Sequence, residues 1–215
     1  MVVKLAIVAG GPETLIPDLL DPKYENFQWI GADRGTFVLL SKNIKPIKAF
    51  GDFDSVSKVE YHVIAEQAVD CETFPCEKDK TDLELAIDWA LAKKPQQLLI
   101  FGVTGGRQDH ALSAVYLLLK ASRKATRMQL VDKKNSIELL DSGIYHLEKE
   151  PNYPYLSFLA ISGKVTGLTL RGVKYPLHDA ELVLGSSLCI SNEQASNVSS
   201  VSFASGLLLM MRCSD

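Results

Sequence analysis

The sequence contains little cysteine, no long apolar run and no excess of positive charge. Only four of its 215 residues are cysteines, and no histidine lies near them at zinc-finger spacing. We therefore expect reduced structural thiols in a cytoplasmic protein, with a redox role for Cys71 and Cys76 as the alternative. No stretch approaches the roughly 20 apolar residues of a membrane-spanning helix, and residues 1–8 are typical of a strand rather than of a signal peptide. A net charge of −3 offers no broad attraction for nucleic acid, so we expect neither a membrane nor a nucleic-acid partner.

The composition is otherwise that of an ordinary globular protein. Apolar residues make up 47% of the chain and charged residues 23%. A chain of this length forms one large domain or two small ones, and it can bury a substantial core without disulfides.

The first half of the chain alternates short apolar runs with helical patterns. The apolar runs predict strands at residues 4–9, 28–32, 47–50, 98–103 and 128–131. Because strands and helices alternate, we predict an α/β domain with a mainly parallel sheet over residues 1–132.

Two helices are predicted between these strands. Thr81 and Glu84 match a capping box at the start of the first helix. The second helix is predicted from about residue 109 to 120, with one apolar face toward the sheet. That face would consist of Leu112, Val115, Tyr116 and Leu119.

The second half of the chain is rich in short β-type runs and shows little helical periodicity. These runs lie at residues 144–147, 155–161, 164–170, 181–184, 198–203 and 207–212. Turn residues separate them, which predicts an all-β sandwich, with a small barrel as the alternative. We expect this second domain to span residues 133–215.

Four polar clusters rich in carboxylates occur in the first half of the chain. They lie at residues 31–35, 51–55, 78–82 and 104–110. In an open α/β sheet, ligands bind outside the carboxyl ends of the strands, so clusters that follow strands of one sheet converge there. Several carboxylates at one place repel each other unless a cation neutralises them. Oxygen ligands alone favour a hard cation such as Mg²⁺.

The second and third clusters carry paired acids. Asp52 and Asp54 are two residues apart in an extended or turn segment, so both project to the same side. This favours a metal-binding loop, with an acidic surface loop as the alternative. Asp79 and Asp82 lie at a predicted helix start, where Asp82 either stabilises the helix or helps to bind phosphate beside Lys80.

The fourth cluster is a glycine-rich loop between a strand and a helix. Thr104, Gly105, Gly106 and Arg107 combine free backbone amides with an arginine, which predicts an anion site. The loop is neither a Walker A motif nor a complete G-x-G-x-x-G motif. Asp109 and His110, which follow it, either form an ion pair that fixes the turn or contact a ligand.

Together these motifs resemble those of the thiamine pyrophosphokinase family. The resemblance rests on Ala32-Asp33-Arg34-Gly35, Gly51-Asp52-Phe53-Asp54-Ser55, Lys78-Asp79-Lys80-Thr81-Asp82-Leu83-Glu84 and Gly105-Gly106-Arg107-Gln108-Asp109-His110. Each motif is short, but four in this order, followed by a β-rich tail, are specific. The resemblance implies transfer of a pyrophosphoryl group from ATP to the thiamine hydroxyl, giving thiamine diphosphate and AMP.

The resemblance also implies roles for individual residues and a homodimer with active sites shared between subunits. The implied active-site acids are Asp33, Asp52, Asp54, Asp82 and Asp109, of which Asp52, Asp54 and Asp82 are the Mg²⁺ ligands. The residues expected near the nucleotide are Arg34, Lys80, Thr81, Thr104, Gly105, Gly106 and Arg107. The residues expected near thiamine are Tyr175, in Gly172-Val173-Lys174-Tyr175-Pro176-Leu177, and Ser191 and Asn192.

The expected chemistry follows from charge. Attack of a hydroxyl on the β-phosphorus passes through a highly anionic transition state, which Mg²⁺ and nearby cations stabilise. Two alternatives remain. One is another Mg²⁺-dependent phosphotransferase that acts on a different small alcohol, and the other is a non-catalytic nucleotide-binding module.

Overall fold

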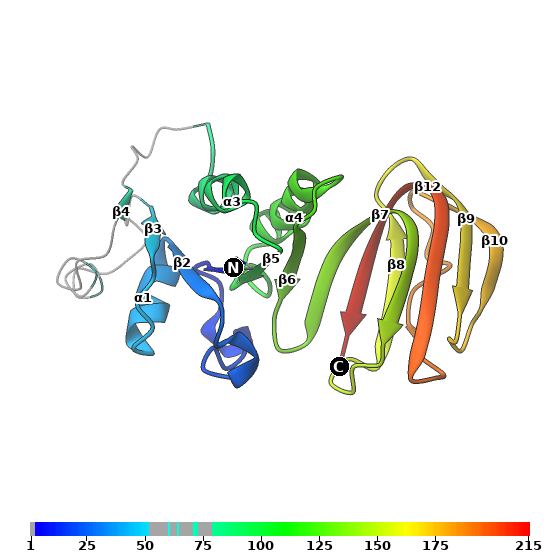
Figure 1. The fold of residues 1–215 in the computed structure, drawn as a ribbon, viewed down its shortest axis with the longest axis horizontal. Helices are drawn as coiled ribbons and strands as arrows, with labels where there is room; N and C mark the ends of the chain where they lie inside the picture. Colours follow the sequence, from blue (N-terminus) through cyan, green and yellow to red (C-terminus); the bar gives the residue numbers. More distant parts are fainter. Residues whose placement is uncertain (1–2, 52–59, 61–63, 65–70, 73–78) are drawn as a thin grey trace. The chain divides into compact units, whose positions relative to one another are not determined.

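The structure is a computed structural model that describes residues 3–51, 60, 64, 71–72 and 79–215 (Figure 1). Contacts within the chain divide it into two compact units, Met1–Lys133 and Lys134–Asp215. In the described residues, no helix combines the length and the apolar character needed to span a membrane.

The first unit is built on a parallel sheet. Its strands are β1 (Lys4–Val8), β2 (Gln28–Ala32), β3 (Lys48–Phe50), β4 (Cys71–Glu72), β5 (Gln97–Phe101) and β6 (Arg127–Val131). They lie in the order β6-β5-β1-β2-β3-β4, and each neighbouring pair is parallel. The chain therefore winds outward from β1 to β4 and then returns to place β5 on the other side of β1. The winding direction reverses between β1 and β5, which is where ligands bind in sheets of this kind.

Helices cover both faces of this sheet. They are α1 (Arg34–Ser41), α3 (Asp82–Ala92) and α4 (Gln108–Leu117), and α4 continues as a 3-10 turn over Leu118–Ala121. Figure 1 shows α1 on one face and α3 and α4 on the other. On the α1 side, Val38 and Leu39 pack in a buried cluster with Val8 of β1 and Phe101 of β5. This packing fixes α1 against the ends of β1 and β5.

The predicted orientation of α4 is wrong. Leu112 and Tyr116 are about three-fifths exposed and Leu119 is also exposed, whereas Ala114 and Leu117 are buried. The reason is that α4 and its 3-10 extension carry two apolar stripes at helical spacing. Periodicity alone does not decide which stripe is buried, and here it is the stripe with Ala114 and Leu117.

The second unit contains only antiparallel strand pairs. Its strands are β7 (Asn135–Glu148), β8 (Tyr155–Ala160), β9 (Lys164–Arg171), β10 (Leu177–Val183), β11 (Asn192–Glu193) and β12 (Val198–Cys213). The first half of β12 pairs with β7 and β9, and its second half pairs with β7 and β8. The register shifts between Phe203 and Leu207, beside Gly206, whose φ of +98° suits glycine. Buried side chains of this unit, including Phe158, Leu168 and Val201, form one core.

Candidate functional site

The loops after β1 and β5 meet at the reversal point of the sheet. The backbone N–H of Gly11 donates to the carbonyl oxygen of Gly102 at 2.8 Å. A Cβ atom placed on Gly11 would lie 2.4 Å from that oxygen, so a side chain does not fit there. Gly102 also has a φ of +69°. Both glycines are therefore required by this close approach of two backbones.

Asp33 follows β2 and lies against the end of β3. Its N–H donates to the carbonyl oxygen of Phe50 at 2.8 Å, and its φ is +49°, which is uncommon for a residue other than glycine. A Cβ atom on Gly51 would lie 2.7 Å from Asp33 Oδ1. The Asp33 carboxylate is thus beside the start of the 51–55 cluster. Asp52 and Asp54 of that cluster lie outside the described residues.

Arg34, the first residue of α1, forms ion pairs with two acids. Its Nη2 atom lies 2.8 Å from Glu13 Oε1 and its Nε atom lies 3.0 Å from Glu60 Oε1. Glu13 comes from the segment after β1, so Arg34 ties that segment to the start of α1. Sequence reasoning expected Arg34 near the nucleotide and missed both of its carboxylate partners.

The start of α3 has a side-chain cap. Thr81 Oγ1 accepts a hydrogen bond from the N–H of Glu84 at 3.2 Å, which confirms the predicted cap at Thr81. Asp82 is the first helical residue and is only 8% exposed. Burial of a carboxylate is costly unless charges or donors compensate it, and the positive end of the α3 dipole contributes such compensation.

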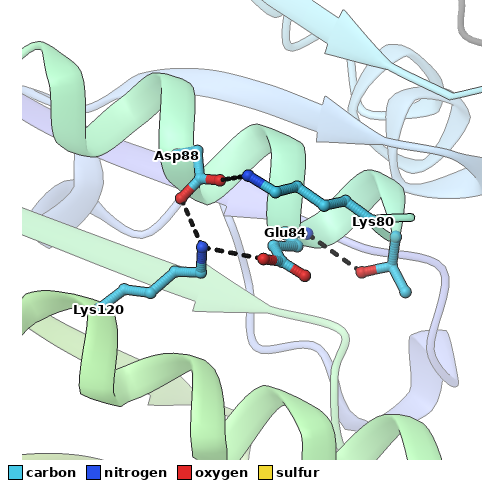
Figure 2. Close-up of polar contacts among 5 residues, drawn as sticks. Lys80, Glu84, Asp88 and Lys120 are labelled. Atoms are coloured by element: carbon cyan, nitrogen blue, oxygen red, sulfur yellow. Dashed lines mark hydrogen bonds and ion pairs between the residues drawn. The ribbon is translucent and has the colours of Figure 1, made fainter. Parts of the chain in front are cut away.

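Glu84, the second residue of the predicted capping box, forms an ion pair with its side chain. The Glu84 carboxylate lies 2.9 Å from Lys120 Nζ, and Lys120 Nζ also lies 2.8 Å from Asp88 Oδ1 (Figure 2). Lys80 Nζ approaches the second carboxylate oxygen of Asp88 at 2.8 Å. Lys80, which sequence reasoning placed near the nucleotide, is therefore held along α3 by Asp88.

Charge balance in this group shifts two pKa values. Burial opposes ionisation of Asp88, but hydrogen bonds from Lys120 and Lys80 outweigh it and lower the pKa of Asp88. Burial likewise opposes the charge of Lys120, but hydrogen bonds to Asp88 and Glu84 outweigh it and raise the pKa of Lys120. Glu84 and Asp88 are one helical turn apart on α3, so the sequence places both acids on one side of the helix, but it does not identify Lys120 as their partner.

The glycine-rich loop after β5 contacts the end of β6. Thr104 Oγ1 donates to Asp132 Oδ2 at 2.5 Å, and Asp132 is 2% exposed. Asp132 directly follows β6, so it is an acid after a strand, as in the clusters at residues 31–35, 51–55 and 104–110. Sequence reasoning nevertheless missed it, because Asp132 has no acidic neighbour.

Arg107 and Asp109 form an exposed ion pair at the start of α4. Arg107 Nη2 lies 2.6 Å from Asp109 Oδ2, and Arg107 Nε donates to Asp109 Oδ1 at 3.1 Å. The N–H of His110 also donates to Asp109 Oδ1, at 3.0 Å. Hydrogen bonds from Arg107 are the main reason that the pKa of Asp109 falls to about 2. Asp109 therefore pairs with Arg107, and His110 contributes its backbone to this turn.

The second unit brings the three expected thiamine residues together. Asn192 Oδ1 accepts from the N–H of Tyr175 at 3.0 Å, and Asn192 Nδ2 donates to the Tyr175 carbonyl at 2.9 Å. The N–H of Ser191 donates to Ser157 Oγ at 2.9 Å, and Ser191 has a φ of +56°. The Tyr175 side chain is exposed, whereas Asn192 is buried.

The described residues contain no group of three or more histidine, cysteine or acidic side chains arranged to hold a metal ion. The expected ligands Asp52 and Asp54 fall outside them. Of the thiols, Cys189 is buried, and burial raises its pKa. Cys76 and the side chain of Cys71 also lie outside the described residues.

Comparison with known proteins matches the chain to two family descriptions. Residues 24–151 match "Thiamin pyrophosphokinase, catalytic domain" and residues 144–208 match "Thiamin pyrophosphokinase, vitamin B1 binding domain". The chain is 47% identical to the thiamine pyrophosphokinase of Bacillus subtilis over 209 residues, which cover 97% of this chain and 98% of the relative.

Solved structures agree with the sequence matches. The crystal structure of the Bacillus subtilis thiamine pyrophosphokinase superposes with a TM-score of 0.94 at 46% identity, covering 99% of each chain. The thiamin pyrophosphokinase of Geobacillus thermodenitrificans gives a TM-score of 0.90 at 41% identity, covering 99% of this chain and 98% of that one. With acids at the strand ends, two matching domain descriptions and these relatives, the chain belongs to the thiamin pyrophosphokinase family.

Proposed function

We infer that this chain is an ATP:thiamine diphosphotransferase. It transfers a pyrophosphoryl group from ATP to the hydroxyl of thiamine and releases AMP and thiamine diphosphate. The observation that carries this conclusion is the 47% identity to the Bacillus subtilis enzyme along nearly the whole of both chains. The matches to a catalytic and to a vitamin B1 binding domain support the same activity.

We propose that the two domains divide the substrates. Residues 1–132 form the α/β domain that binds ATP and Mg²⁺, which is supported by the parallel strands and by the acids after β2 and at the start of α3. Residues 133–215 form an all-β sandwich that binds thiamine. The sandwich is supported by the antiparallel pairing and by β12, which pairs with β9 in its first half and with β8 in its second half. Thiamine binding is supported by the exposed side chain of Tyr175.

Mg²⁺ suits the carboxylates of the first domain. Asp33 Oδ1 lies beside Gly51, Asp82 is buried at a helix start, and both supply oxygen, the donor that Mg²⁺ prefers. We propose Asp52, Asp54 and Asp82 as the Mg²⁺ ligands. Bound Mg²⁺ neutralises negative charge on the polyphosphate.

The remaining groups of this domain would bind and orient ATP. Backbone amides at the start of α3, after Lys80 and Thr81, and in the loop Thr104–Gly105–Gly106 are suited to phosphate oxygens. Arg107 is exposed and would add positive charge where negative charge develops in the transition state. Arg34, held by two acids, would shape the nucleotide site from the start of α1.

Asp33 is the better candidate for the group that accepts the proton of the thiamine hydroxyl. Asp109 has a pKa of about 2 because Arg107 stabilises its charged form, so it is a weak proton acceptor. Asp33, in contrast, lies at the strand ends beside Gly51, the first residue of the 51–55 cluster. We propose that Asp109 instead orients Arg107 toward the nucleotide.

We also propose that the enzyme is a homodimer with active sites at the subunit interface. The support is the apolar stripe on α4 and the 3-10 turn that continues it, where Leu112, Tyr116 and Leu119 are exposed to solvent in the single chain. Contiguous exposed apolar side chains on a helix are typical of a contact surface.

Product analysis tests the activity. The protein is incubated with ATP, Mg²⁺ and thiamine, and the products are separated by chromatography. We expect AMP and thiamine diphosphate in equal amounts. ADP or free phosphate, or turnover only with another small alcohol, would instead establish a different phosphotransferase.

A further inference from the structure

Asn192 forms a two-point contact with the backbone of Tyr175. Its Oδ1 atom accepts from the Tyr175 N–H at 3.0 Å, and its Nδ2 atom donates to the Tyr175 carbonyl at 2.9 Å. A backbone N–H only donates and a carbonyl only accepts, so a single orientation of the Asn192 amide satisfies both bonds.

The Asn192 amide has little capacity left for a ligand. Its Oδ1 atom accepts a second hydrogen bond, from the N–H of Glu193 at 2.9 Å, which occupies both lone pairs of that oxygen. The residue is only 2% exposed. A small molecule in solution would therefore contact the residues around Asn192 and not its amide group.

Tyr175 has the opposite character, with a fixed backbone and an exposed ring. Its side chain is 60% exposed. The neighbouring N–H of Lys174 donates to the carbonyl of Glu193 at 2.8 Å, which holds the same two segments together. The ring is thus presented to solvent from a backbone that β11 fixes at two successive residues.

We propose that Asn192 is a positioning residue that acts through Tyr175 and does not itself contact thiamine. By fixing the backbone of Tyr175, Asn192 holds the exposed ring where it stacks on a flat heteroaromatic ring of the substrate. This inference rests on the proposed function, and it changes the role expected for Asn192 from a substrate contact to a support for one.

Gln194 provides a matched control. It is also a buried amide, 8% exposed, two residues further along the chain. Its Nε2 atom donates to the Leu147 carbonyl at 3.0 Å and to Ser199 Oγ at 2.7 Å, so its bonds serve β7 and β12. Gln194→Ala removes a comparable buried amide from the same segment while leaving the two bonds to the Tyr175 backbone in place.

The test compares steady-state kinetics of Asn192→Ala and Gln194→Ala. We expect Asn192→Ala to raise the KM for thiamine about tenfold, within the range of an aromatic stacking contact, and to leave the KM for ATP unchanged. We expect Gln194→Ala to lower the unfolding temperature and to leave both KM values unchanged. Equal effects of the two variants on the thiamine KM, or a parallel rise in the ATP KM, would overturn the proposal. If Asn192→Ala does not fold, Asn192→Asp, which keeps the shape and loses the Nδ2 donor, takes its place.

A double-mutant cycle decides whether Asn192 acts through Tyr175. We expect Tyr175→Ala to raise the thiamine KM at least as much as Asn192→Ala, and the double variant to be no worse than Tyr175→Ala alone. Independent, multiplying effects would show that Asn192 contacts thiamine itself. A wild-type protein that forms no thiamine diphosphate would refute the proposed function. An active wild type with an unaltered Asn192→Ala variant would refute only this inference.

Discussion

Asp33 has an uncommon backbone conformation at a place where chemistry is expected. A positive φ costs a residue other than glycine about 1 kcal/mol or more, and it persists only where the surroundings hold it. Here the hydrogen bond from its N–H to Phe50 ties it to the end of β3. The result is a carboxylate beside Gly51, the residue that precedes Asp52 in the sequence.

Asp54 tests the metal role at the residue scale. We expect Asp54→Ala to lower formation of thiamine diphosphate by a factor on the order of a thousand or more, because the polyphosphate loses its main charge compensation. The measurement is product formation from ATP and thiamine, with circular dichroism to verify folding. Asp18→Ala, which removes an exposed acid of the same domain, is the control and should retain normal turnover. Near-normal turnover of Asp54→Ala would contradict the metal role.

The ion pair of Arg107 and Asp109 gives a prediction on pH. The pKa of Asp109 is lowered from 3.8 to about 2 in the folded protein. A lowered carboxyl pKa contributes stability that is present above the unfolded pKa and is lost as the pH falls toward the folded one, here between about 4 and 2. We expect Arg107→Ala to return the pKa of Asp109 toward 3.8, as measured by carbon-13 NMR titration of its carboxyl group. An unchanged titration would show that Arg107 does not set this pKa.

At the scale of elements, Lys120 links the 3-10 turn after α4 to α3. Its Nζ atom contacts two acids of α3, Glu84 and Asp88, whereas Lys80 contacts Asp88 from the residue before the helix cap (Figure 2). If Lys80 moves to a phosphate, Asp88 keeps Lys120 as a partner. If Lys80 leaves, the Asp88 carboxylate is therefore still paired, with Lys120.

This difference separates the two lysines experimentally. We expect Lys120→Met to lower the free energy of unfolding by about 0.5–1 kcal/mol, since the contacts are partly screened by solvent, and to leave the KM for ATP unchanged. Lys80→Met should affect stability less and should raise the KM for ATP severalfold. Thermal unfolding and steady-state kinetics of both variants provide the measurement, and identical behaviour of the two would contradict this division of roles.

At the scale of the whole molecule, the exposed stripe of α4 bears on assembly. Leu112 is 59% exposed and Leu20, elsewhere in the same domain, is 65% exposed. We expect Leu112→Asp to shift the protein from dimer to monomer, because a charge on the contact surface would lose its water on association. Leu20→Asp should leave the oligomeric state unchanged. Sedimentation analysis distinguishes the two, and a wild-type monomer at high concentration would refute the dimer.

Local patterns were enough to predict much of the first domain. The runs at 28–32 and 128–131 coincide with β2 and β6 to within a residue, and the cap at Thr81 forms as expected. These features depend on residues a few positions apart, where chain geometry is nearly fixed by the local conformation. The acids Asp33 and Asp52, which follow the runs at 28–32 and 47–50, were visible for the same reason.

Contacts between residues far apart in the sequence could not be predicted from local patterns. The periodicity of α4 allowed two buried faces, and packing against the sheet selected Ala114 and Leu117 over Leu112 and Tyr116. The partners of Lys120, Glu84 and Asp88, depended on how α3 and the turn after α4 lie together, and Asp132 became notable only through its contact with Thr104.

The sequence by itself determined the family, most strands of the first domain and three of the places where acids follow strands, because these depend on neighbouring residues. It did not predict α1, β4 or β11, and the runs at 198–203 and 207–212 form the single strand β12. The tertiary structure alone decided which of these groups meet. Tyr175 and Asn192 are 17 residues apart, and two hydrogen bonds join them only because the chain returns along β11. This contact depends on the path of the whole chain. For that reason Asn192, which the sequence suggested as a substrate contact, is instead a buried residue that supports the backbone of Tyr175.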